Sequence, residues 1–132
     1  MTYIIDTHVL LWTIFSPKKI SQKAKTILTQ PDPIKFVSII SFWEVSLKFS
    51  LKKIDLKGIQ PEKLPGLAEE SHFEILNLKF EIASSYHKLP YGKHKDPFDR
   101  MLAWQAIKEG YTLLSSDKDF LNYKDYGLRV IW

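Results

Sequence analysis

Short apolar runs alternate along the chain with longer segments whose apolar residues recur at helical spacing. The short runs, several rich in β-branched residues, are typical of buried strands. They predict strands at Tyr3–Ile5, Ile34–Ile40, Phe73–Leu76, Thr112–Ser116 and Leu128–Ile131. The longer segments predict helices at Thr7–Phe15, Gln22–Thr29, Ser41–Leu51, Pro61–Ser71, Lys79–His87 and Pro97–Glu109, and a helical turn at Phe120–Tyr123. Residues 54–59 fit neither pattern.

This alternation favours an α/β fold in which a mainly parallel sheet has helices on both faces, a three-layer α/β/α arrangement. In such sheets, ligands bind beyond the carboxyl ends of the strands. Candidate chemistry is therefore sought at that edge.

Composition narrows the possibilities further. The chain has 132 residues, of which 45% are hydrophobic and 26% charged, so we expect one globular domain over residues 1–132. The absence of cysteine excludes disulfides, zinc–thiolate sites and a cysteine nucleophile. The uncharged stretch Thr7–Pro17 has 11 residues, too few to span a membrane. Asp6 precedes every Lys and Arg, unlike the start of a signal peptide. We expect a cytoplasmic protein with no membrane association.

Four acidic residues fall where the fold places ligands. Asp6 and Asp117 follow predicted strands, and Glu44 and Asp99 lie near the starts of predicted helices, where negative charge is favoured. Asp99 shares a helix face with apolar residues three, four and seven positions later, and Glu44 with Leu47 and Leu51. Because a carboxylate facing the core needs a partner or a cation, the pattern predicts one acidic cleft.

Each acid also has a purely structural interpretation. Ser41 and Glu44 match a capping box, and Glu44 is spaced to pair with Lys48. Asp96 is suited to cap the helix that Pro97 begins, and Asp117 to form a turn. The coincidence of four acids at one edge favours the cleft.

Four carboxylates without cysteine or paired histidines suit a hard divalent cation, Mg²⁺ or else Mn²⁺. The four histidines show no H-x-x-x-H spacing, which disfavours histidine-bound zinc. His8 is close enough to Asp6 to reach the cleft, but we expect it to pack in the first helix.

Four segments together resemble the PIN domain, and within it the VapC-type toxins of bacterial toxin–antitoxin pairs. Tyr3–Thr7 resembles the family's opening strand and first acid, and Ser41–Val45 its second acidic motif. Asp96–Ala103 closely resembles the D-P-F-D-R-x-L-A stretch of one VapC subgroup. Leu114–Phe120 resembles the fourth motif, T-x-D-x-x-F, with Ser115 at the threonine position. These motifs span the chain in the family's order.

The resemblance implies a PIN-like fold and a metal-dependent ribonuclease. Asp6, Asp99 and Asp117 would hold Mg²⁺, and Glu44 would complete the catalytic set by binding a second metal ion or orienting water. Ser115, Asp119 and Asp96 would support these acids, with Asp96 also expected as the helix cap. For Arg100 a phosphate contact and a pairing with a nearby acid are equally open.

Charge segregation supports an RNA substrate. Lys and Arg number 19 against 15 Asp and Glu. Setting the four site acids aside leaves 19 − 11, or +8, on the rest of the molecule. Lys93 and Lys95, in the basic loop with His94, and Lys48, beside Lys52 and Lys53, are candidate phosphate contacts, although either cluster is also typical of a solvated surface. Tyr91 is a candidate for base stacking, whereas we expect Trp43 in the core.

Other functions fit less well. A receiver-type phosphoryl-acceptor domain needs paired acids after the first strand and a lysine at the end of a late strand. A haloacid-dehalogenase-type phosphatase needs a D-x-D motif after the first strand. Asp6-Thr7-His8 offers only one acid at that place. A non-catalytic RNA-binding PIN-like module remains an alternative, disfavoured by the four intact acids.

Partners follow from the resemblance and from charge. The family implies a cognate protein antitoxin and a homodimer. An acidic cleft would accept an Arg or Lys of the antitoxin, which would displace metal. Its apolar residues would lie beside the early helices, where Leu10, Leu11, Phe15 and Phe49 are candidate contacts.

Overall fold

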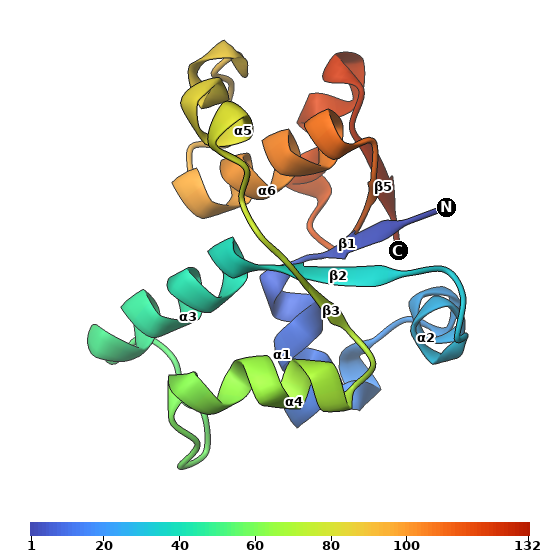
Figure 1. Cartoon of the computed structure of the whole chain (residues 1–132), viewed down its shortest axis with the longest axis vertical. Helices are drawn as coiled ribbons and strands as arrows, with labels where there is room; N and C mark the ends of the chain where they lie inside the picture. The colour runs from blue at the N-terminus through green and yellow to red at the C-terminus, as the bar shows by residue number, and fades with distance from the viewer.

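Five short strands form one parallel sheet at the centre of the computed structural model, which describes residues 1–132 (Figure 1). The strands are β1 (Tyr3–Ile5), β2 (Lys35–Ser38), β3 (Glu74–Leu76), β4 (Thr112–Leu114) and β5 (Arg129–Ile131). Their order is β3-β2-β1-β4-β5, and every pairing is parallel. The predicted parallel α/β sheet is confirmed.

Helices cover both faces of the sheet (Figure 1). The α-helices are α1 (Thr7–Phe15), α2 (Gln22–Thr29), α3 (Ile39–Ser50), α4 (Leu64–Glu70), α5 (Phe80–Ser84) and α6 (Pro97–Glu109). The 3₁₀ segments are η1 (Pro17–Lys19), η2 (Pro61–Lys63), η3 (Tyr86–Lys88) and η4 (Lys118–Tyr126). In Figure 1, α5 and α6 lie on the opposite side of the sheet from α1, α2 and α4. None of these helices has the length and apolarity to cross a bilayer.

Alternate residues of each strand pack into two separate hydrophobic clusters, one on each face of the sheet. Ile4 packs in the cluster that includes Leu102 and Trp104 of α6, whereas Ile5 packs with Val9 and Leu10 of α1. Successive strand side chains point to opposite faces, and here both faces are covered. This double burial is why the strands appear in the sequence as unbroken apolar runs.

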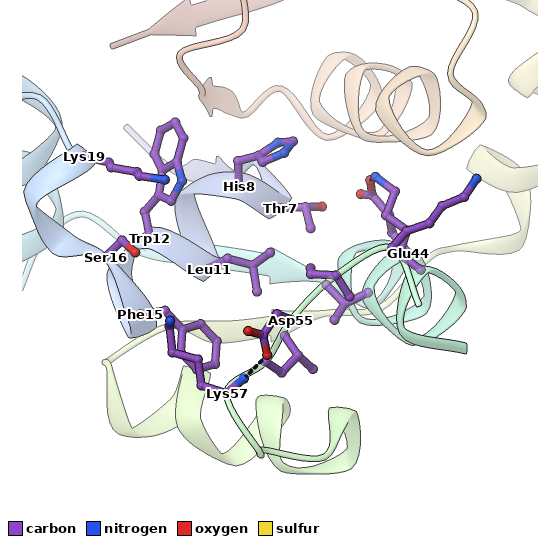
Figure 2. Close-up of a pocket in the computed structure, with 15 residues that line it drawn as sticks. Thr7, His8, Leu11, Trp12, Phe15, Ser16, Lys19, Glu44, Asp55 and Lys57 are labelled. Atoms are coloured by element: carbon purple, nitrogen blue, oxygen red, sulfur yellow. Dashed lines mark hydrogen bonds and ion pairs between the residues drawn. The ribbon is translucent and has the colours of Figure 1, made fainter. Parts of the chain in front are cut away.

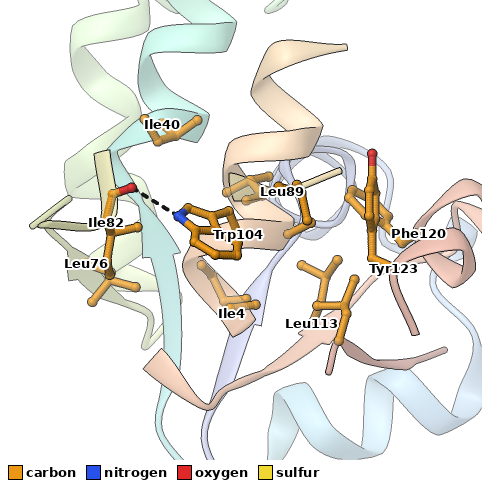
Figure 3. Packing of buried hydrophobic residues seen from close by; sticks show 13 residues of the cluster. Ile4, Ile40, Leu76, Ile82, Leu89, Trp104, Leu113, Phe120 and Tyr123 are labelled. Carbon is orange, nitrogen blue, oxygen red and sulfur yellow. Dashed lines mark hydrogen bonds between the residues drawn. The ribbon is translucent and has the colours of Figure 1, made fainter. Parts of the chain in front are cut away.

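Trp104 connects the α6 layer to the segment that follows β3. Its indole Nε1 donates to the Ile82 carbonyl oxygen at 3.1 Å, so the ring packs in the core with its one polar atom satisfied (Figure 3). Leu102, Ala103 and Ala106, predicted to share a helix face with Asp99, are fully buried. That packing fixes the orientation of α6, and with it the direction of Asp99.

The start of α3 differs from the prediction. The side chain of Ser38, not Ser41, caps the helix by accepting the Ile40 N–H at 3.1 Å, so β2 ends at Ser38 and α3 begins at Ile39. Glu44 therefore lies in the second turn, and the predicted capping box is wrong. Ser41 is instead buried and accepts a hydrogen bond from the Thr7 hydroxyl at 2.8 Å, which ties α3 to α1.

Other boundaries shift by smaller amounts. Strand β4 ends at Leu114, so Ser115 and Ser116 separate it from Asp117. The predicted helix 79–87 divides into α5 and η3, and the helix expected from Pro61 begins as η2. The predicted turn at 120–123 is the centre of the longer η4. These short 3₁₀ segments have no apolar periodicity that a sequence pattern could detect.

The acids meet where the strand order reverses. The chain passes from β1 to β2 and β3 on one side, then crosses to β4 and β5 on the other side of β1. In parallel sheets such a reversal opens a crevice beyond the carboxyl ends of the central strands. Asp6 follows β1 directly, and Asp117 follows β4 by three residues. Sheet topology thus places both carboxylates beside one crevice.

Candidate metal centre

Asp6 forms the floor of the centre. It is 2% exposed and precedes the first residue of α1, where the helix dipole favours negative charge. Its side chain makes no capping bond to the helix. Its backbone N–H donates to the Leu114 carbonyl oxygen at 3.0 Å, which anchors it to β4. The carboxylate is therefore held by the sheet and directed into the crevice.

Ser115 couples Asp6 to Asp117. Its hydroxyl donates to Asp6 Oδ2 at 2.8 Å and accepts the backbone N–H of Asp117 at 3.0 Å. Asp117 in turn accepts the Asp119 N–H at 2.9 Å, which begins η4. Asp117 thus forms the turn that the sequence also allowed, while its second carboxylate oxygen stays free of protein hydrogen bonds.

Two groups of potential ligands lie side by side. Carboxylate oxygens of Glu44, Asp96 and Asp99 lie within 4.8 Å of one another. A second group joins His94, Asp117 and Asp119 within the same limit. Asp96 also caps α6 as predicted, accepting the N–H groups of Phe98 and Asp99 at 2.9 and 3.2 Å.

His94 links the two groups, although no sequence pattern indicates it. Its Nε2 lies 3.0 Å from Asp99 Oδ2, and the ring is 7% exposed. Its neighbours Lys93 and Lys95 predict a solvent-facing basic loop. His94 precedes α6 and belongs to no periodic pattern, so only the folded loop shows that its ring turns inward.

The donor chemistry fits a hard divalent cation. Asp6 Oδ1 and Glu44 Oε1 are buried and have no hydrogen-bond partner. A buried carboxylate oxygen without a partner carries a large desolvation cost unless a cation offsets it. An oxygen-rich set of this kind is what Mg²⁺ and Mn²⁺ prefer. Of the four predicted acids, Glu44 and Asp99 share one ligand group and Asp117 belongs to the other. Asp6 belongs to neither group, but Ser115 joins it to Asp117. These carboxylates are candidate ligands for such an ion.

Crowding alters the acidity of the centre. Burial raises the pKa of Asp6, against the opposing effect of the Ser115 hydrogen bond. Burial also raises the pKa of Asp99 to about 6, with the His94 hydrogen bond opposing and the charge of Asp6 reinforcing the shift. Without a cation, both carboxyl groups therefore bind a proton more readily than an exposed aspartate does.

Comparison with known proteins agrees with this arrangement. The model of the PIN domain family matches residues 3–126. The chain belongs to the PIN domain family. The match includes all four acids and both groups of potential ligands.

Individual relatives of this PIN domain are distant but full-length. Ribonuclease VapC22 of Mycobacterium tuberculosis (strain ATCC 25618 / H37Rv) is 25% identical over 99% of this chain and 98% of that protein. The crystal structure of VapBC2 from Rickettsia felis, bound to a DNA fragment from its promoter, matches with TM-score 0.70, 20% identity and coverage of 99% and 98%. FitAcB from Neisseria gonorrhoeae matches with TM-score 0.66, 20% identity and coverage of 98% and 96%. The two structures establish the fold.

Arg100 has neither of the expected roles in this PIN domain. It is 0% exposed, so it is not accessible to a phosphate, and no carboxylate pairs with it. Its guanidinium donates hydrogen bonds to the hydroxyls of Tyr86 and Tyr123. It also donates to the backbone carbonyl oxygens of Leu89, Pro90 and His94. Arg100 therefore fastens the loop that carries His94 onto α6.

A groove of about 400 Å³ runs beside the acids, between α1, α3 and residues 53–57. Figure 2 shows Leu11 and Phe15 on its wall, with Glu44 near one end. His8 is exposed and lines the groove, contrary to the expectation that it packs in the helix. Leu10 was predicted to contact the antitoxin, but it is fully buried and does not line the groove.

Some of the residues considered as nucleic-acid contacts face solvent, and others contact neighbouring side chains. Lys93, Lys95 and Tyr91 are exposed in the loop before α6. Lys48 is turned toward the centre and pairs with Glu44, the alternative that helical spacing allowed. Trp43 is 62% exposed, so its predicted place in the core is wrong; its ring packs edge-on against Phe98 at 5.1 Å between centroids.

The raised pKa of Asp99 predicts a specific pH dependence. Because the folded value of about 6 exceeds the ordinary 3.8, protonated Asp99 stabilises the fold below pH 4, and this stabilisation is lost as pH rises through 6. In chelator, D99N, which cannot ionise, should exceed wild type by about 1 to 2 kcal/mol in free energy of unfolding near neutral pH. Urea denaturation across this pH range measures the difference.

The exposed Asp125 provides the control for this experiment. D125N should keep the wild-type pH dependence. If the free energy of unfolding of D99N fell over this pH range as steeply as that of wild type, the pKa of Asp99 would not be raised in the folded protein.

Proposed function

We propose that this PIN domain is a metal-dependent ribonuclease that hydrolyses RNA phosphodiester bonds and acts as the toxin of a toxin–antitoxin pair. The observation that carries the proposal is that buried oxygens of Asp6 and Glu44 lack hydrogen-bond partners. Glu44 and Asp99 lie in one group of potential ligands, and both interact electrostatically with Asp6. The name of the relative VapC22 as a ribonuclease supports the reaction class.

The chain's own residues have distinct tasks in this reaction. Asp6, Asp99 and Asp117 would hold Mg²⁺, for which Mn²⁺ is a chemical substitute, and Glu44 would orient a water molecule at the edge of the site. The bound ion supplies positive charge to the phosphodiester and acidifies water. Ser115 and His94 fix the directions of Asp6 and Asp99. Asp96 and Asp119 hold the turns that carry Asp99 and Asp117.

Substrate binding would use the exposed lysines around the crevice. Lys93 and Lys95 precede α6, which also carries Asp99, so phosphates bound to them would lie near the centre. Tyr91, exposed in the same loop, offers a ring for an unpaired base. A non-catalytic RNA-binding module fits less well, because it would not need to bury unpartnered carboxylates.

Cleavage should depend on the individual acids. Replacing Asp6 or Asp99 by Asn removes a charged ligand while keeping side-chain shape. Either variant should therefore lower Mg²⁺-dependent cleavage of single-stranded RNA by at least about a hundredfold. Gel-resolved cleavage of a mixed RNA panel, with Mg²⁺ or chelator, measures this.

The exposed Asp125 again gives the matched control, since D125N makes the same chemical change at a residue outside both ligand groups. Full activity in folded D6N or D99N protein, or cleavage undiminished by chelator, would contradict the assignment.

We further propose that a cognate antitoxin occupies the groove beside α1 and α3. The groove joins an apolar wall of Leu11, Trp12 and Phe15 to a rim of four lysines, and it ends at Glu44. An amphipathic segment with acidic residues would complement the wall and the rim. From the Glu44 end, an Arg or Lys of that segment would reach the carboxylates and exclude metal. Solved complexes named VapBC share this fold.

Reversing charges on the groove rim should weaken antitoxin binding. Lys53 and Lys57 are exposed, so K53E/K57E should fold normally. The variant should raise the dissociation constant for a candidate antitoxin, taken from the gene that neighbours the one encoding this chain, at least about tenfold. Calorimetry at two salt concentrations measures this, with K124E as the control for charge alone. Equal weakening by both variants would place the antitoxin elsewhere.

We also propose a homodimer formed through α3. Exposed apolar residues spaced four apart form a stripe at Ile39, Trp43 and Leu47 of α3 and at its C-cap, Leu51. The expectation that Leu47 and Leu51 share a core-facing side of the helix with Glu44 is therefore wrong. An apolar cavity of about 370 Å³, lined by Trp43, Phe98 and Met101 among others, continues this surface. Two copies of a self-complementary helix face would bury the stripe and bring two crevices together.

A charge within the stripe should separate the subunits. Leu47 is 39% exposed and lies outside the three core clusters, so L47E should give a folded monomer where wild type is a dimer. Light scattering over a concentration series measures the mass. L121E, a matched change at an exposed leucine of η4, should remain dimeric. A monomeric wild type, or a dimeric L47E, would contradict this face.

A further inference from the structure

Lys48 already places a cation at the candidate metal centre. It lies one helical turn after Glu44 on α3, and its Nζ donates to Glu44 Oε2. The Lys48 side chain is 34% exposed, whereas that of Glu44 is 2% exposed. The pair therefore joins a partly exposed ammonium group to a buried carboxylate.

The surrounding charges hold the ammonium group there. Partial burial opposes its charge, but the hydrogen bond and charge of Glu44, with the charges of Asp96 and Asp99, raise the pKa of Lys48 overall. Glu44, Asp96 and Asp99 are the three residues whose oxygens form one of the two ligand groups. Lys48 thus contacts Glu44 directly, and the negative charges of Asp96 and Asp99 lie near enough to favour its charged form.

An exposed ion pair of this spacing contributes little to stability, so by itself it does not indicate a function on an open helix face. This pair differs because the Glu44 carboxylate is buried among other acids. A lysine ammonium is a compact point charge with three donors and can neutralise several oxygens at once. Two cations a few ångströms apart in such a site repel each other strongly.

We propose that Lys48 is a resident cation of the Glu44–Asp96–Asp99 group and restricts the centre to one divalent ion, held by Asp6, Asp99 and Asp117. This inference rests on the proposed metal-dependent function. Lys48 is then a positioning residue: it orients Glu44 and supplies the second positive charge near the phosphodiester without using a second metal site.

Counting bound Mn²⁺ tests this role independently of cleavage. Electron paramagnetic resonance of free Mn²⁺ in a titration gives the number of ions bound per chain. Wild type should bind one. K48M, whose unbranched side chain is one heavy atom shorter and carries no charge, should bind two, because Glu44 becomes available. K48R, which keeps the charge, should bind one.

Three further variants test whether the charge of Lys48 is the cause. K53M removes an exposed lysine that lines the same groove and has no ion pair, so it should bind one Mn²⁺. E44Q combined with K48M removes the ligand that Lys48 had occupied, so it should return the count from two to one. K48Q repeats the K48M measurement with a polar side chain and should bind two.

The possible failures are distinguishable. Clear binding of one Mn²⁺ by K48M and K48Q, or of two by wild type, would overturn the role of Lys48 and leave the nuclease proposal intact. Absence of Mn²⁺ binding in wild type and in every variant would overturn the metal centre and, with it, the inference.

Discussion

The burial of several like-charged carboxylates at the end of the central strand is the constraint on which the rest of the site depends. Asp6 cannot leave this position, because its backbone continues β1 and its N–H is bonded to β4. Glu44 and Asp99 repel it from the neighbouring helices. Such a cluster is unfavourable in isolation, so each adjoining feature offsets part of its charge: the Ser115 hydroxyl, the His94 ring and the Lys48 ammonium.

A second buried charge sets the geometry of this arrangement. Arg100 follows Asp99 on α6, and its guanidinium lies in a shell of tyrosine hydroxyls and carbonyl oxygens. Its guanidinium plane also stacks on Tyr91 at 3.9 Å. A buried charge bonded only to neutral groups is costly to disrupt, because its donors would be left unsatisfied. Arg100 thus holds the loop that places His94 against Asp99.

Much of the fold was predictable because both faces of the sheet are buried. That burial produces unbroken apolar strands, and the helices between them show their inner faces by periodicity. The convergence of the acids followed from one rule of parallel sheets, together with the apolar neighbours of Asp99 on α6. The sequence resemblance then proposed roles for these residues, and the family match agrees with it.

The cap of α3 and the surroundings of Arg100 and Trp43 were not predicted from the sequence. At each of these places the local sequence is compatible with more than one structure. Ser38 and Ser41 are both suitable helix caps, and the deciding contact is the distant hydroxyl of Thr7. Charge alone favoured a phosphate or a nearby acid as the partner of Arg100, and aromatic character favoured the core for Trp43. Which side of a helix meets a loop, and which meets solvent, depends on tertiary contacts between residues far apart in sequence.

The central claim is that the buried carboxylates form a cation site, and anomalous diffraction from a crystal soaked in Mn²⁺ tests it most directly. The account predicts an anomalous peak at the carboxyl end of β1, within about 2.2 Å of carboxylate oxygens of Asp6 and Asp99. No peak in the crevice at saturating Mn²⁺, with these side chains ordered and accessible, would contradict it.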